Sequence, residues 1–96
     1  MEKKHFEYSL QLQGVSADEP VSTQISFTNH DDIFRIIGLI EQKGIFPTAS
    51  DAAEFAIGLK LFTEVILRNR SLELFKELQP ALQKFMVQLK KYNAAQ

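Results

Sequence analysis

Two groups of polar side chains in this sequence have residue types that could do chemistry. The first is the run His30, Asp31 and Asp32, because imidazole and carboxylate groups bind metals and transfer protons. Three adjacent residues do not converge on one ion, and the other histidine, His5, falls on the polar face of a predicted strand. Acidic residues also gather where a helix begins, near the positive end of its dipole. We therefore interpret the run as a capped helix start, with no metal ligand or catalytic residue.

The second group is a ladder of charges at i, i+4 spacing, formed by Lys60, Glu64 and Arg68. On one interpretation it is a narrow strip in solvent, where each pair contributes about 0.3–0.5 kcal/mol. On the other, a second helix or subunit covers it, and the ion pairs fix the register of two surfaces. Large apolar side chains flank the ladder, namely Ile57, Leu61 and Leu67. Both interpretations stay open, and a catalytic lysine is disfavoured because the sequence indicates no substrate pocket.

Composition excludes several classes of protein. Of the 96 residues, 45% are hydrophobic and 24% are charged, as in a globular rather than a disordered chain. The absence of cysteine excludes disulfides, thiolate metal sites and cysteine nucleophiles. A net charge of -1 gives no bulk attraction to nucleic acid, and no apolar run reaches the length of a membrane span. We expect a cytoplasmic protein with no cofactor, no nucleic-acid partner and no membrane partner.

Two segments alternate between apolar and polar residues, which is the pattern of half-buried β-strands. They are residues 4–13 and 21–28. The segment between them contains Gly14 and Pro20, two residue types that are typical of turns. We therefore expect a loose antiparallel hairpin, joined by a loop over residues 14–20.

Three later segments have helical periodicity. They are residues 30–43, 50–68 and 71–91. Because an interior proline costs a helix about 3 kcal/mol, the last helix is expected to be kinked or broken near Pro80. Residues 93–96 are expected to form a frayed tail. The order predicts an α+β fold, a single domain over residues 1–96 in which three helices pack on one face of the hairpin.

The central helix is apolar almost all the way round, which places it at the centre of the fold. Its expected cap is Thr48 or Ser50, with Asp51 in the first turn. Its predicted core face is Phe55, Leu59, Phe62 and Ile66, with Val65 beside it. Gly58 borders this face, and we expect another backbone to approach closely there.

Two surfaces have features of a protein–protein interface. The second strand is uncharged, so its residues Ser22, Gln24 and Ser26 could pair with a strand of a second copy. The other surface is the outer side of the helices, represented by Leu39, Ile57, Leu61 and Leu67. We therefore predict a homodimeric interaction or regulatory module. The alternative is a ligand-binding protein or an enzyme with a pocket between hairpin and helices, lined by groups such as Lys60, Glu64 and His30.

Three stretches of the sequence resemble a small bacterial family that is a domain of unknown function. They are HDDIFRII (30–37), GLKLFTEVILRNR (58–70) and LFKELQPALQKFMVQLK (74–90). The resemblance covers nearly the whole chain in order. It implies a cytosolic α+β domain that occurs as a stand-alone protein, and it implies no activity, cofactor or catalytic residue.

Overall fold

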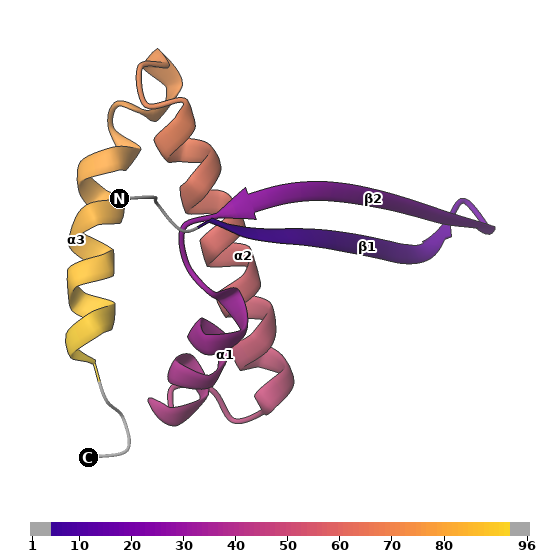
Figure 1. Cartoon of the computed structure of the whole chain (residues 1–96), viewed down its shortest axis with the longest axis horizontal. Helices are drawn as coiled ribbons and strands as arrows, with labels where there is room; N and C mark the ends of the chain where they lie inside the picture. Colours follow the sequence, from indigo (N-terminus) through magenta and orange to yellow (C-terminus); the bar gives the residue numbers. More distant parts are fainter. Residues whose placement is uncertain (1–4, 93–96) are drawn as a thin grey trace. The chain divides into compact units, whose positions relative to one another are not determined.

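The computed structural model describes residues 5–92, and its elements follow the predicted order of two strands and then helices (Figure 1). The elements are β1 (Phe6–Ser16), β2 (Glu19–Asn29), α1 (Ile33–Gln42), α2 (Ala49–Arg68), the 3-10 turn η1 (Glu73–Phe75) and α3 (Leu78–Lys91). This order confirms the α+β prediction. The predicted tail at 93–96 and the first residue of the predicted strand 4–13 lie outside the described residues.

The chain divides into two compact units, Met1–Asp32 and Ile33–Gln96. The first contains the hairpin of β1 and β2, and the second contains the helices. The single domain and the packing of the helices on one face of the hairpin therefore stay predictions.

The hairpin is a regular two-stranded antiparallel ladder that runs from the pair Phe6–Asn29 to the pair Ser16–Glu19. The turn between the strands has only two residues, Ala17 and Asp18, with φ values of 52° and 66°. Two consecutive positive φ values are the mark of a type I′ turn, whose twist matches that of the strands. The prediction of a loose loop over residues 14–20 is therefore wrong, and both strands are longer than the alternating pattern indicated.

The two turn-forming residues of the predicted loop lie inside the ladder. Gly14 pairs with Val21, and Pro20 pairs with Val15. A proline is tolerated in an edge strand where its nitrogen faces away from the neighbouring strand. In a two-stranded sheet both strands are edge strands, so neither residue ends the pairing.

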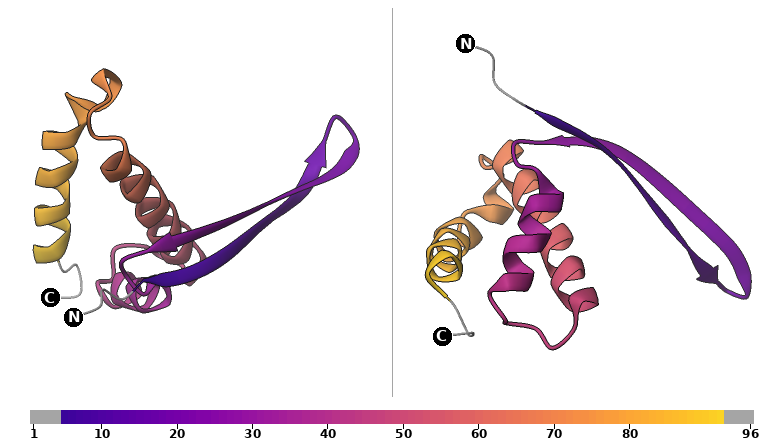
Figure 2. Two further views of the ribbon diagram at one scale, coloured as in Figure 1. Left: turned by 45° about the horizontal axis from the view of Figure 1, so that its top comes forward. Right: turned by 60° about the horizontal axis from the view of Figure 1, so that its bottom comes forward.

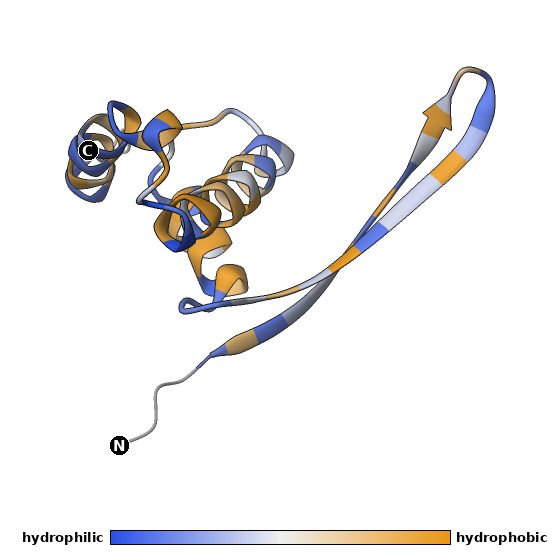
Figure 3. Cartoon of the chain, turned by 90° about the horizontal axis from the view of Figure 1, so that it is seen from above, coloured by the Kyte–Doolittle hydropathy of each residue, from blue (hydrophilic) through white to orange (hydrophobic). Residues whose placement is uncertain are grey.

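Alternation gives the hairpin one apolar and one polar face, and Figure 3 shows the hydropathy changing from residue to residue along the strands. The hairpin apolar face consists of Tyr8, Leu10, Leu12, Val21, Thr23, Ile25 and Phe27. Tyr8 stacks on Phe27, with 5.4 Å between the ring centroids. Nearer the turn the face is open, since 68% of Leu12 and 47% of Ile25 are exposed. The prediction of half-buried strands is therefore correct only for the strand ends that lie farthest from the turn.

The first helix begins later than the run of acidic residues indicated. Asn29 is buried, and its Oδ1 accepts a hydrogen bond from the backbone N–H of Asp31 at 3.0 Å. The Tyr8 hydroxyl donates to the carbonyl oxygen of Asp31 at 3.1 Å. These bonds hold a turn, and α1 starts only at Ile33. Asp31 and Asp32 therefore precede the helix, which corrects their predicted place in its first turn.

In the helical unit, α1 and α2 lie side by side in all the ribbon views (Figures 1 and 2). Thr48, one of the two predicted caps, caps α2, because its Oγ1 accepts a hydrogen bond from the backbone N–H of Asp51 at 3.1 Å. The buried core cluster consists of Ile40, Ala52, Ala56 and Leu89. Because Ala52 and Ala56 are small, α1 can approach α2 closely at these positions. The larger side chains of the predicted core face would hold the two helices farther apart.

The predicted core face of α2 is correct in part. Ile66 is buried, Phe55 and Leu59 are half-buried, and Phe62 is 48% exposed. A Cβ atom added at Gly58 would meet nothing within 4 Å, so the expected close approach of another backbone at this glycine is wrong within the chain.

The last part of the chain forms η1 and then α3, which begins at Leu78 rather than near Ser71. Pro80 therefore lies in the first turn of α3, where backbone N–H groups have no partner within the helix. Proline costs little at such a position. The C-terminal end of α3 is held by Lys43, whose Nζ donates to the carbonyl oxygens of Lys90 and Tyr92, both at 3.1 Å.

Candidate functional site

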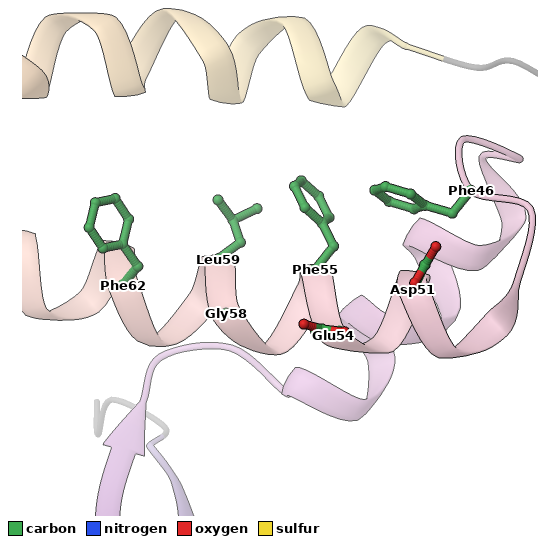
Figure 4. A pocket seen from close by; sticks show the side chains of 7 residues that line it. All are labelled: Phe46, Asp51, Glu54, Phe55, Gly58, Leu59 and Phe62. Carbon is green, nitrogen blue, oxygen red and sulfur yellow. The ribbon is translucent and has the colours of Figure 1, made fainter.

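The helical unit contains two adjoining hollows lined mostly by aromatic and aliphatic side chains, which together we name the phenylalanine groove. One hollow has a volume of about 490 Å³, and its lining is Phe46, Asp51, Glu54, Phe55, Gly58, Leu59 and Phe62. The other has a volume of about 700 Å³, and its lining is Ile45, Phe46, Phe55, Phe85, Gln88, Leu89, Lys91 and Tyr92. In Figure 4 the apolar side chains of the first hollow point toward α3.

Ring contacts give the phenylalanine groove its shape. The ring centroids of Phe46 and Phe55 are 5.1 Å apart, and Phe55 meets Phe85 edge-on at 6.4 Å. Phe46 comes from the segment between α1 and α2, and Phe85 comes from α3. The groove therefore brings three segments together around Phe55. Its walls offer apolar contact, and its charged groups are the two acids of the first hollow and Lys91 of the second.

The predicted ladder on α2 does not line this groove. Lys60 and Glu64 are half-buried, and Arg68 is exposed. The side chains of Lys60 and Glu64 are therefore partly covered within their own chain, and cover of the ladder by a second subunit stays a prediction. None of the three residues lines either hollow of the groove.

The predicted His30, Asp31 and Asp32 cluster belongs to the hairpin unit, whereas Lys60 and Glu64 belong to the helical unit. The imidazole rings of His5 and His30 lie with their centroids 5.0 Å apart. Among residues 5–92, no group of three or more histidine, aspartate or glutamate side chains could hold a metal ion.

The predicted interface residues of the helices differ in exposure. Leu67 is 57% exposed and Leu39 is 39% exposed, while Ile57 and Leu61 are half-buried within their own chain. The apolar surface available on the outer side of the helices is therefore smaller than the sequence indicated. Val65, which was expected beside the core, is exposed instead.

The predicted interface residues of the hairpin all lie on its polar face. Ser22, Gln24 and Ser26 are exposed, and Gln24 Nε2 donates to Ser9 Oγ across the strands at 2.6 Å. The opposite side of the same strand belongs to the hairpin apolar face, where Val21 and Ile25 are each about half exposed. Among the described residues the sheet has two strands, so no third strand of this chain covers either edge.

The groove residues on the connecting segment and on α3 were not singled out from sequence as site residues. Phe46 lies two residues after Gly44 in a short linker, and Phe85 has the spacing of an ordinary core residue of an amphipathic helix. Nothing in such spacing separates a core phenylalanine from one that lines a hollow. In the described part of the chain, no helix combines the length and the apolar character that a membrane crossing requires.

Comparison with known proteins places the fold within a family. Residues 7–91 match the family described as "Domain of Unknown Function with solved-structure structure (DUF3861)". The crystal structure of a protein of unknown function from Pectobacterium atrosepticum is similar to this chain with a TM-score of 0.82. The two sequences are 30% identical, and the match covers 92% of this chain and 99% of that one. Among the curated proteins, none matches. These matches confirm the resemblance to a bacterial domain of unknown function, and the chain belongs to the DUF3861 family.

Proposed function

We propose that this protein is a cytosolic interaction module that acts as a homodimer, and that the hairpin supplies the contact surface. The observation that carries the proposal is a regular two-stranded sheet whose apolar face is open. An isolated two-stranded sheet is at best marginally stable in water, and a third strand or a covering layer is needed for independent stability. A second copy of the chain would supply that layer.

The apolar residues near the turn are numerous enough to support association. Leu12 is 68% exposed, and Val21 and Ile25 are 49% and 47% exposed. Full burial of one such side chain contributes about 1.5–3 kcal/mol. Counted once in each copy, covering the exposed fractions of all three would contribute roughly 5–10 kcal/mol before the cost of association. Association itself costs about 4–15 kcal/mol, so these side chains support a dimer together with further contacts, such as hydrogen bonds between strands.

Sedimentation equilibrium at micromolar concentration tests the proposal. We expect twice the chain mass of 11.0 kDa for the natural sequence and a single chain mass for Ile25→Glu, because Ile25 lies on β2 and is about half exposed. The matched control is Leu74→Glu, because Leu74 is 79% exposed but lies in η1 rather than in the hairpin. The control should stay dimeric. A natural protein that sediments as one chain at this concentration would refute the homodimer.

A second candidate function is the binding of a small apolar molecule in the phenylalanine groove. Its larger hollow, of about 700 Å³, has the size of known small-molecule sites, which span about 300–1,000 Å³. Titration with a fluorescent anilinonaphthalene dye tests this function. Saturable binding at one site, lost in Phe85→Asp and kept in Phe34→Asp, would support it, since exposed Phe34 does not line the groove.

A further inference from the structure

We infer that two copies of this chain join β2 to β2 in antiparallel fashion, about a twofold axis at Gln24, and so form one four-stranded sheet. The inference rests on the proposed homodimer and specifies its contact. It names the strand edge, the register and the residues on the axis. Four steps carry it: the direction of the backbone groups, the chemistry of the two edges, the fit of the side chains and the apolar surface beside the free edge.

The turn fixes which backbone groups of β2 point away from β1. In a two-residue turn the flanking pair, here Ser16 and Glu19, is hydrogen-bonded, and hydrogen-bonded pairs then alternate with open pairs along the ladder. Glu19 and every second residue after it therefore bond to β1. The residues between them present N–H and C=O groups outward, and these are Ser22, Gln24, Ser26 and Thr28. Pro20, which has no N–H, lies at an outward position where β1 requires none.

The outer edge of β2 lacks the features that usually protect a strand edge. Natural edges are blunted by charged side chains, prolines or bulges. From Val21 to Asn29 the strand has no charged residue, and the register continues without a bulge. Pro20 lies only near the turn. The outer edge of β1 is less open, because Glu7 occupies one of its outward positions.

Side-chain pairing selects Gln24 as the centre. With Gln24 on the axis, Ser22 faces Ser26 of the second copy on the polar face. On the apolar face Val21 then faces Phe27, and Thr23 faces Ile25. A shift by one step in one direction would place Val21 opposite the buried polar Asn29, and a shift in the other would place Glu19 opposite Phe27. In the Gln24 register, but in neither shifted register, each apolar or threonine side chain from Val21 to Phe27 on the apolar face meets another such side chain. Cross-strand pairs of this kind stabilise a sheet.

Apolar surface also lies beside the free edge of β2. A strand added to β2 covers one side of Val21 and Ile25, which are each about half exposed. It also removes the free edge that makes a two-stranded sheet marginal. A symmetric pair uses the same patch on both copies, so one uncharged strand is sufficient for both sides of the contact. A second copy is therefore the occupant that this edge fits.

Disulfide trapping tests the register, and the chain suits it because it has no cysteine. In the inferred sheet the two Cα atoms at position 24 form a hydrogen-bonded pair about 5.5 Å apart, within the range of a disulfide. We expect Gln24→Cys to form a covalent dimer on mild oxidation. The matched control is Gln11→Cys, because Gln11 pairs with Gln24 on the same polar face of the hairpin. In the inferred sheet the two copies of position 11 are three strand spacings, about 14 Å, apart, and should stay reduced.

Amide hydrogen exchange on the unmodified protein provides a second test that needs no variant. The N–H groups of Ser22, Gln24 and Ser26 should exchange more than about 100-fold more slowly than those of Ser9, Gln11 and Gln13, and dilution should remove the difference. Fast exchange at both edges in a dimer would overturn the β2 contact.

The outcomes separate the inference from the proposed function. A dimer by sedimentation in which Gln11→Cys cross-links and Gln24→Cys does not would place the contact on β1 and overturn the inference alone. A dimer in which neither variant cross-links would assign the contact to the sheet faces or the helices, again overturning the inference alone. A monomer by sedimentation would overturn both.

Discussion

Lys43 Nζ donates hydrogen bonds to the main-chain carbonyl oxygens of Lys90 and Tyr92, both at 3.1 Å. The last carbonyl groups of a helix have no partner within it, and a cation at that end also favours the helix dipole. Lys43 follows the last residue of α1, so its side chain links the end of α1 to the end of α3. It is a polar link beside the phenylalanine groove, to which α3 contributes Phe85 and Lys91.

Lys43→Met should loosen the C-terminal end of α3. Methionine keeps most of the length and apolar volume of lysine but donates no hydrogen bond. We expect a loss of about 0.5–1.5 kcal/mol in the free energy of unfolding, the usual worth of such bonds, and faster amide exchange near Leu89. Chemical denaturation together with hydrogen exchange measures both effects. The control is Lys84→Met, because Lys84 is exposed on α3. Equal losses of unfolding free energy in the two variants would contradict the prediction.

Asn29→Leu should destabilise the hairpin unit. Asn29 is 1% exposed, and its Oδ1 satisfies the backbone N–H of Asp31. Leucine has a similar volume but no acceptor, so the buried N–H would lose its partner at a cost of about 1–3 kcal/mol. Urea denaturation gives the change in unfolding free energy. Thr28→Leu, at an exposed neighbouring position, should cost less than about 0.5 kcal/mol. A loss in Asn29→Leu no larger than in that control would show that the bond contributes little.

The strands were predictable from sequence because alternation over residues 6–13 depends on local chemistry alone. Their ends were not. Gly14 and Pro20 are typical of turns, yet both lie inside the ladder. The actual turn is Ala17–Asp18, and alanine at φ 52° is not a residue that a type I′ turn favours. A propensity argument therefore selects the wrong residues for this turn.

The helical core was predicted less well than the helices themselves. An argument from helical periodicity gives most weight to large apolar side chains. The sequence therefore indicated Phe55 and Phe62 as core residues. The structure buries Ala52 and Ala56, whose small size lets α1 approach α2. The groove could not be predicted either, because it depends on where α3 lies over α2. The placement of a helix that packs through few residues is a tertiary property that no single segment encodes.

Ala17→Asn combined with Asp18→Gly should stabilise the hairpin. Both positions have positive φ, where alanine costs about 1–2 kcal/mol, and Asn-Gly is the pair that a type I′ turn prefers. We expect about 1 kcal/mol of added stability, seen as a higher denaturation midpoint. The strand register should not change, so the sedimentation behaviour should also stay the same. Unchanged or lower stability would show that the turn adopts another conformation in solution.

Gly58→Ala should stabilise the helical unit by about 1 kcal/mol, because alanine is a better helix former than glycine by that amount. The position is exposed, and an added Cβ atom would meet nothing within 4 Å. Thermal unfolding measures the gain, with an expected rise in Tm of about 4–8 °C for a domain of this size. The control is the opposite substitution, Ala81→Gly, at an exposed position of α3. It should lower the unfolding free energy by a similar amount.

The same variant also reports on association. Gly58 borders the phenylalanine groove, and the sequence favoured a close approach of another backbone at this glycine. If Gly58→Ala destabilises the dimer but stabilises the Ile25→Glu monomer, a second copy must approach the helix at Gly58. The contact between copies would then include α2 as well as the hairpin. If both forms gain stability equally, the glycine faces solvent in the dimer, and the contact lies away from this side of α2.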